Sequence, residues 1–430
     1  MHTQLSLFPE IEIKKYSNGN ANKIDEGDKL IHNWYRFVLS FPPHLVREYI
    51  RKFGLSRGDT ILDPFCGTGT TIVESKLNGL TAIGIEANPM AHFASRVKTD
   101  FSVDPDLLLC DSQKVAQLAT EVIERYSASE LRTLSEEEFS LLLTDSISPL
   151  PLHKTLILLN EIRKFDSKHI NNQLLSLATS TVKNASNLHF GPEVGVSRRK
   201  KADANVVQSW LEAVKGMASD LKQIESGTYP PSRIINGDSR DLDKYLEKES
   251  IKAVFTSPPY PNEKDYTRTT RLESVILGFM KSKGQLKELK KNLLRSNSRN
   301  VYKGDDDDKY ILNHREIMRI ADEIESRRIA LKKTSGFERL YHKVTRLYFG
   351  GMAKHLESLK LYLSKNALLG YVVGDQASYL QVYIPTGKIL ADIAQNMGYE
   401  LMGMDLFRTR FATATKKDMN EEVVVLKWRG

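Results

Sequence analysis

The stretch that decides the fold reads Thr60-Ile61-Leu62-Asp63-Pro64-Phe65-Cys66-Gly67-Thr68-Gly69-Thr70-Thr71. Its first four residues form a short apolar strand that ends in an acid, and a glycine-rich loop follows. Residues 72–77 have the apolar spacing of a helix, and residues 81–86 form a second strand that ends in Glu86. This order of strand, glycine-rich loop, helix, strand and acid predicts a βαβ unit.

The same alternation returns later in the chain. Strands are predicted at 233–238, 251–255 and 367–373, a helix at 389–397, and a terminal antiparallel pair at 401–407 and 423–428. Two long segments interrupt the pattern: 105–230 is leucine-rich and helical, and 267–345 is rich in Lys, Arg and Asn. The acidic run 305–308 within the second segment is most simply a solvated loop. The sequence therefore predicts an α/β fold with a mostly parallel sheet and two largely helical insertions.

The bulk composition excludes several classes of protein. The 430 residues are 40% hydrophobic and 27% charged, which is ordinary for a soluble chain. A net charge of +8 favours a polyanionic partner. The two cysteines, Cys66 and Cys110, predict neither a disulfide framework nor a zinc site, and no metal is expected. No apolar run approaches a membrane span and no secretory core opens the chain, so a cytoplasmic location is predicted.

A second motif, Thr256-Ser257-Pro258-Pro259-Tyr260, directly follows the strand at 251–255. Two prolines forbid a continued ladder or helix, so the chain must turn where ligands bind in open α/β sheets. Ser257-Pro258-Pro259-Tyr260 resembles the catalytic motif of amino-methyltransferases, which methylate the exocyclic amine of cytosine or adenine.

The loop that begins at Asp63 resembles the S-adenosylmethionine loop of DNA amino-methyltransferases. Gly67 and Gly69 let the backbone approach a ligand, and Glu86 is placed to accept bonds from ribose hydroxyls. The spacing is neither the dinucleotide G-x-G-x-x-G nor a Walker loop, and a structural turn without a ligand is the remaining alternative. The resemblance implies a Rossmann-like methyltransferase with a seven-stranded sheet. The predicted cofactor-binding residues are Phe41, Pro42, Asp63, Pro64, Phe65, Cys66, Gly67, Gly69, Thr70, Glu86, Asp238 and Ser239.

The second motif suits methyl transfer to an amine. A Ser257 hydroxyl and the Pro258 carbonyl can accept bonds from the amine hydrogens and stabilise the positive charge that grows on nitrogen. Tyr260 offers a ring on which a flipped base can stack. Serine at the first position resembles the cytosine-modifying members, which favours N4-cytosine over N6-adenine. Methylation at cytosine C5 is disfavoured because neither cysteine follows a proline.

Basic residues and a terminal peptide suggest partners. Arg268 or Arg271 after the motif, Arg198 and Arg199 in the first insertion and Arg295 in the second are candidate contacts to double-stranded DNA, although each is equally well read as a solvated surface residue. Residues Gln4-Leu5-Ser6-Leu7-Phe8 match the peptide by which bacterial proteins dock on the replication sliding clamp. Gln4, Leu5, Leu7 and Phe8 would bind the clamp, and chance or packing on the chain's own domain are the alternatives.

The predicted organisation alternates core and insertion. A flexible tail covers 1–30, and the core covers 31–105, 231–270 and 346–430. The helical insertion 106–230 and the basic insertion 271–345 are each candidates for target recognition. The favoured function is a site-specific N4-cytosine DNA methyltransferase, with a possible cognate restriction endonuclease. The alternatives are N6-adenine methylation, the same chemistry on RNA, or a clamp- or DNA-binding protein with a vestigial methyltransferase fold.

Overall fold

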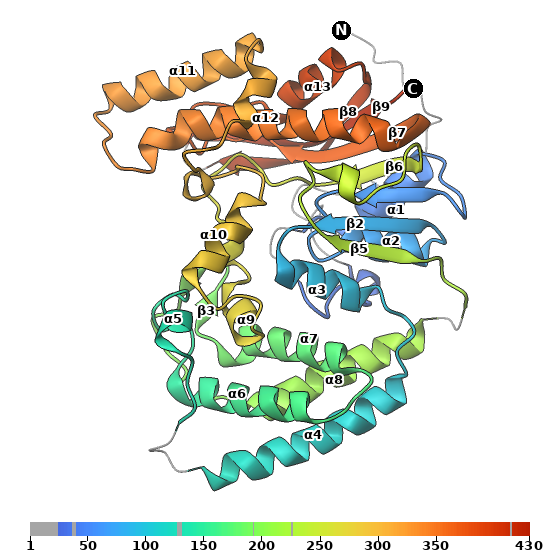
Figure 1. Ribbon diagram of the computed structural model, residues 1–430, viewed down its shortest axis with the longest axis vertical. Coiled ribbons are helices and arrows are strands. Elements are labelled where there is room, and N and C mark those ends of the chain that lie inside the picture. The colour runs from blue at the N-terminus through green and yellow to red at the C-terminus, as the bar shows by residue number, and fades with distance from the viewer. Residues whose placement is uncertain (1–24, 37–39, 127–130, 192, 225–226, 413–414) are drawn as a thin grey trace.

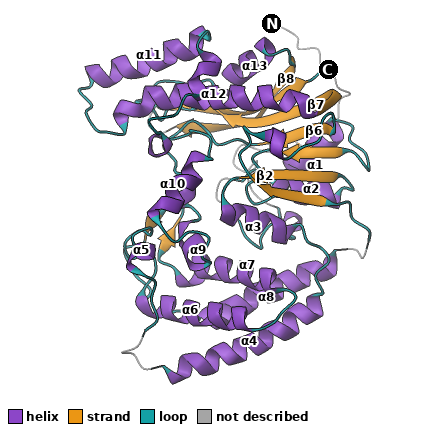
Figure 2. Cartoon of the chain, in the orientation of Figure 1, coloured by secondary structure: helices purple, strands orange, loops and turns teal. Residues whose placement is uncertain are grey.

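The centre of the protein is a seven-stranded sheet in the order β5-β2-β1-β6-β7-β9-β8 (Figures 1 and 2). A computed structural model describes residues 25–36, 40–126, 131–191, 193–224, 227–412 and 415–430. The strands are β1 Thr60–Asp63, β2 Thr81–Glu86, β5 Ser232–Asn236, β6 Ile251–Thr256, β7 Leu363–Gly374, β8 Glu400–Ala412 and β9 Lys417–Lys427. The predicted strands at 60–63 and 81–86 have the observed bounds.

Only one strand runs against the others. The β1/β2, β1/β6, β2/β5 and β6/β7 pairs are parallel, and β9 lies antiparallel between β7 and β8. The predicted Rossmann-like methyltransferase fold is therefore confirmed. Because β1 and β6 are adjacent and parallel, the glycine-rich loop and the Ser-Pro-Pro-Tyr motif emerge side by side at the carboxyl edge of the sheet.

Successive side chains along each strand point to opposite faces of the sheet, and each face has its own hydrophobic core. Ile61 and Phe255 point toward α1 (Pro43–Lys52) and α2 (Thr70–Leu77), where they join one buried cluster. Leu62 and Val254 point to the opposite face, which α12 (Tyr341–Leu359) and α13 (Thr386–Asn396) cover. The period of two along a strand thus buries both faces of the sheet, as expected for parallel strands.

The first insertion is a helical layer with its own core. It comprises α4 (Pro105–Arg125), α5 (Glu136–Phe139), α6 (Pro149–Lys164), α7 (Ile170–Ser180) and α8 (Val206–Gln223). Figure 1 shows α4, α6, α7 and α8 stacked below the sheet, with α3 (Pro89–Lys98) between them and the strands. A short hairpin, β3 (Leu188–His189) with β4 (Gly195–Val196), leaves this layer toward the active-site edge.

The second insertion contains α9 (Arg271–Ile276), α10 (Lys283–Lys291) and α11 (Arg315–Ala330) and leads into α12. It extends from the helical layer, where α9 lies beside α7, to the α11–α12 side of the sheet. In Figure 1, α10 lies between the helical layer at the bottom and the α11–α12 pair at the top. No helix in the described part of the chain is long and apolar enough to cross a membrane.

The flexible amino-terminal tail was predicted to extend to residue 30, but buried contacts begin before that residue. Asp28 is buried, and its carboxylate pairs with Arg47 of α1. Arg47 also pairs with Glu74 of α2, so the chain just before Ile31 is tied to the first two helices of the core. Ordered packing therefore begins within the segment predicted as a flexible tail, because the polar residues there have buried partners.

Candidate active site

Asp63 ends β1 and joins it to the neighbouring strand β6. Its Oδ1 accepts a hydrogen bond from the Phe65 backbone N–H at 3.1 Å and another from the Thr256 hydroxyl at 2.5 Å. The residue is only 1% exposed, and burial raises the pKa of its carboxyl to about 6. Asp63, predicted as a cofactor contact, therefore lies behind the loop and shapes it instead of facing the cavity.

The loop itself depends on two glycines with positive φ. Gly67 has a φ of 52° and Gly69 a φ of 85°. A Cβ on Gly69 would lie 2.4 Å from the Ser95 hydroxyl oxygen, so no larger residue fits between the loop and α3. Gly69 is also the residue from which α2 begins, so the unpaired N–H groups of a helix start lie beside this loop.

Glu86 at the end of β2 reaches back to the same loop. Its Oε2 accepts a bond from the Gly67 N–H at 2.8 Å, and its Oε1 accepts one from the Asn88 N–H at 2.7 Å. Burial raises the pKa of this carboxyl to about 7. The side chain is half-buried and lines the cavity described below, so it keeps acceptor capacity for a ligand.

The Ser-Pro-Pro-Tyr motif is held by its neighbours in the sheet. The Ser257 hydroxyl donates to the Val372 carbonyl of β7 at 3.1 Å, so its oxygen can act as an acceptor. The Tyr260 N–H donates to the Tyr266 hydroxyl oxygen at 3.1 Å. A Cβ on Gly374 would touch the Tyr260 ring at 3.0 Å, so this glycine leaves room for the ring.

One cavity of about 440 Å³ joins the loop to the motif. This volume is within the range of small-molecule sites. The predicted site residues that line it are Phe41, Pro64, Phe65, Cys66, Gly67, Thr70, Glu86, Ser239, Ser257, Pro258, Pro259 and Tyr260. Four predicted cofactor residues are not among its lining residues: Pro42, Asp63, Gly69 and Asp238.

Comparisons with known proteins agree with this geometry. Residues 7–95, which include the glycine-rich loop, match the family model of N6/N4 DNA methylases. The type II methyltransferase M.BsoBI of Geobacillus stearothermophilus is 31% identical over 291 residues, which cover 63% of this chain and 56% of that protein. The chain is similar to DNA amino-methyltransferases over these residues.

Two further type II methyltransferases extend the comparison. M.MvaI of Kocuria varians is 26% identical over 58% of this chain and 62% of its own length. M.AvaI of Nostoc sp. is 24% identical over 90% of this chain and 82% of its own length. The chain thus spans a little over half the length of the first two relatives and most of the third.

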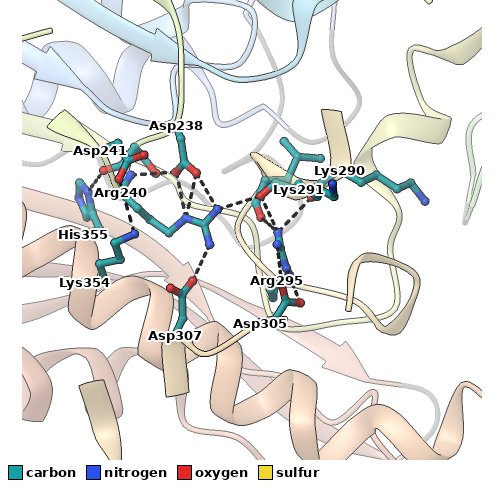
Figure 3. Close-up of polar contacts among 12 residues, drawn as sticks. Asp238, Arg240, Asp241, Lys290, Lys291, Arg295, Asp305, Asp307, Lys354 and His355 are labelled. Carbon is teal, nitrogen blue, oxygen red and sulfur yellow. Dashed lines mark hydrogen bonds and ion pairs between the residues drawn. The ribbon is translucent and has the colours of Figure 1, made fainter. Parts of the chain in front are cut away.

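The third acid of the predicted cofactor site, Asp238, does not face the cavity. Figure 3 shows its carboxylate turned to Arg240, which donates from Nε to Oδ1 at 2.9 Å and from Nη2 to Oδ2 at 2.6 Å. Arg240 also pairs with Asp307. The prediction that Asp238 contacts the cofactor is therefore not supported by this arrangement. The residues on either side of it, Gly237 and Ser239, line the cavity with their backbone and small side chains.

The predicted DNA contacts divide into exposed and internal arginines. Arg198 and Arg199 are exposed in the segment after β4, and Arg268 is half-buried. Arg271 turns inward and donates to the carbonyls of Thr267 and Leu141, at 3.3 Å each.

Arg295 was predicted to contact DNA, but the structure buries it. It is 5% exposed and forms a two-pronged pair with Asp305, at 2.8 and 2.9 Å. Its guanidinium is therefore occupied within the protein. The acidic run 305–308 is likewise not the solvated loop predicted, because Asp307 is buried against Arg240.

Several cavity residues were missed by sequence reasoning. They come from the second insertion, from the segment after β7 and from the terminal hairpin: Asn292, Leu293, Leu294, Gln376, Phe407, Arg408, Arg410 and Glu421. A signal existed for Arg408 and Arg410, because residues two apart on a strand share a face. No local pattern marks Asn292–Leu294, which reach the cavity only through tertiary folding.

The predicted clamp-binding residues Gln4, Leu5, Leu7 and Phe8 lie outside the described residues. Within the described chain, no group of three or more His, Cys, Asp or Glu side chains is arranged to hold a metal ion.

Proposed function

We propose that this protein transfers a methyl group from S-adenosylmethionine to the exocyclic N4 amine of a flipped cytosine in double-stranded DNA. The observation that carries the proposal is the single cavity that joins Glu86 and the glycine-rich loop to Ser257–Tyr260. A cofactor site and an amine-binding motif must share one enclosed space if a methyl group is to pass directly between them.

The residues at the β1 and β2 ends fit the proposed cofactor. Glu86 offers carboxylate oxygens to ribose hydroxyls, while Phe65 supplies an apolar wall. The backbone at Gly67 approaches closely because no side chain intervenes. S-adenosylmethionine, when bound, supplies a methyl group on a positively charged sulfur. The chain itself has to orient this methyl group and exclude water from it.

The motif supplies acceptors for the amine. Because the Ser257 hydroxyl donates its hydrogen to Val372, its lone pairs can accept one amine hydrogen. The Pro258 carbonyl can accept the other, and the rigid Pro258–Pro259 pair keeps that carbonyl in place. Both acceptors stabilise positive charge as it develops on nitrogen. The Tyr260 ring provides a stacking surface for the flipped base.

Serine in the first motif position supports cytosine over adenine in this proposal. The names of the relatives, type II methyltransferases, support a role in a restriction–modification system with a cognate endonuclease. Docking of Gln4–Phe8 on the replication sliding clamp stays a prediction, and retention of the clamp by a Leu7→Ala/Phe8→Ala variant in a pull-down would contradict it.

The exposed Arg198 and Arg199 support DNA binding beside the cavity. They follow the β3–β4 hairpin, and Glu193 of that hairpin lines the cavity. The hairpin therefore reaches the cavity, and two exposed positive side chains follow it in the chain. Phosphate groups of a duplex can contact these two side chains while a flipped base enters the cavity.

The decisive experiment measures methyl transfer from labelled S-adenosylmethionine. Genomic DNA from a methylation-free host, and matched RNA, are incubated with the protein and then digested to nucleosides. N4-methylcytosine from DNA is the expected product. Label only in N6-methyladenine would move the assignment to adenine, and label only in RNA would overturn the DNA proposal. A Ser257→Ala/Tyr260→Ala variant is the matched control and is expected to be inactive.

A further inference from the structure

The segment Lys290–Ser298, here called the bridging segment, is bonded both to Arg240 after β5 and to Asp265 after the Ser-Pro-Pro-Tyr motif. Its residues Asn292–Leu294 line the cavity itself. The sequence suggested a basic, DNA-facing run here, but Lys290 and Arg295 are both buried. What these charged residues contact within the protein indicates a different role for the segment.

Arg295 closes the bridging segment on itself. Its Nη1 donates to the carbonyls of Lys290 and Lys291 at 3.0 and 3.1 Å, while Nε and Nη2 pair with Asp305. Figure 3 shows these bonds converging on one guanidinium. Because a guanidinium presents its donors in a fixed plane, it sets the shape of the backbone around it. The bridging segment is therefore a defined loop with internal support.

Arg240 ties this loop to the cofactor half. Its guanidinium pairs with Asp238 after β5, donates to the Lys291 carbonyl at 3.1 Å, and pairs with Asp307 at 2.5 Å. The residue is 7% exposed, and Asp307 is the first residue of a short helix against α12. One side chain thus holds together the loop that carries Gly237 and Ser239, the bridging segment and the short helix that begins at Asp307.

The bridging segment is also tied to the base half, through Lys290 at one end and Ser298 at the other. Lys290 donates to the buried Asp265 carboxylate at 2.7 Å. Glu263 accepts from the Ser298 N–H at 3.0 Å and from the Ser298 hydroxyl at 2.7 Å. Glu263 and Asp265 lie directly after the Ser-Pro-Pro-Tyr motif. The loop that follows the motif is therefore anchored to the bridging segment at both ends.

We propose that Arg240 is a positioning residue for both halves of the active site, acting through the bridging segment. Arg240 is not among the residues that line the cavity. It holds Lys291, and the bridging segment then holds Glu263 and Asp265 behind the motif. The assignment of the halves to cofactor and base rests on the proposed function, whereas the mechanical link between them does not.

The test begins with the ligand-free protein. Arg240→Lys keeps the buried charge but cannot bond Asp238, Lys291 and Asp307 at once. Hydrogen–deuterium exchange of peptides covering 258–270 is expected to speed up by about fivefold, although Arg240 does not touch them. Arg319→Lys is the matched control, because Arg319 pairs with Glu316 and Glu323 on the exposed face of α11 and is expected to leave this exchange unchanged.

Binding and turnover then separate positioning from general stability. Arg240→Lys is expected to weaken S-adenosylmethionine binding by about tenfold and to lower kcat by about fivefold even at saturating cofactor. Asp307→Asn, which leaves the Asp238–Arg240 pair in place, is expected to give a smaller change of the same kind. Normal kcat at saturating cofactor would confine Arg240 to the cofactor half and overturn the proposal.

The exchange measurement distinguishes this inference from the proposed function. Unchanged exchange in 258–270, with a Tm lowered by the substitution, would reduce Arg240 to a stabilising residue and overturn the link. The other outcome is a wild-type protein that binds no cofactor, while Arg240→Lys still speeds up exchange in 258–270. That result would refute the proposed function and leave the link standing.

Discussion

Glu86 gives the sharpest quantitative prediction for the cofactor site. Burial raises the pKa of its carboxyl to about 7, even though it accepts bonds from the N–H groups of Gly67 and Asn88. Ribose hydroxyls donate to the ionised form, so binding requires the proton to leave. About one carboxyl in ten is ionised at pH 6 and about nine in ten at pH 8, which predicts roughly tenfold tighter binding at pH 8.

A loss of folding stability through Glu86 cannot explain weaker cofactor binding at pH 6. A carboxyl whose folded pKa is raised binds more protons in the native state than in the unfolded state. Its contribution to stability is therefore fully present at pH values below its unfolded pKa and declines as the pH rises toward 7. The protein is not destabilised at pH 6 through Glu86, so weaker binding there reports on the site.

The assay is isothermal titration calorimetry with S-adenosylhomocysteine, which has the same ribose. Titrations between pH 6 and pH 8, in two buffers of different ionisation enthalpy, are expected to show release of close to one proton below pH 7. Glu86→Gln is expected to bind more weakly at pH 8 and to lose this dependence. If wild type and Glu86→Gln show the same pH profile, Glu86 is not the ribose acceptor.

Three further substitutions test the motif and the DNA surface. Ser257→Ala is expected to lower kcat about 10- to 100-fold, because a hydrogen bond to a charged group contributes about 1.5–3 kcal/mol, with cofactor affinity unchanged. Ser378→Ala, in the same cavity but outside the motif, should change kcat less than about twofold, and equal losses would refute the role of Ser257. Tyr260→Ala is expected to raise the KM for DNA, since stacking contributes about 1–3 kcal/mol per base, and Tyr260→Phe should restore it; a failure of phenylalanine to do so would argue against stacking. Arg198→Ala/Arg199→Ala should weaken binding to all DNA sequences alike and reduce the salt slope of log Kd by about two, whereas an unchanged slope would exclude both as phosphate contacts.

The βαβ unit could be predicted because its signals are local. A four-residue apolar strand, two glycines and a strand that ends in an acid each need only neighbouring residues to be recognised. The structure reproduces the strands at 60–63 and 81–86 with the same bounds. The Ser-Pro-Pro-Tyr turn is equally local, because proline fixes its own backbone.

Charged side chains were the least predictable, because their role depends on partners far along the chain. Arg295 and the acidic run 305–308 look solvated in the sequence, yet they pair with each other and with Arg240. Asp238 looked like a cofactor ligand by its place after a strand, but Arg240, two residues later, takes up its carboxylate. No spacing rule distinguishes a buried ion pair from a surface one.

The sequence by itself determined the fold class, the glycine-rich loop and the Ser-Pro-Pro-Tyr turn, since strand period, glycine and proline act through the local backbone. Only the tertiary structure decided which residues share the cavity. Parallel pairing of β1 with β6 brings Glu86 and Ser257 to one edge across about 170 residues of chain. The bridging segment enters the same cavity because buried ion pairs hold it there, and such pairs exist only once the chain has folded.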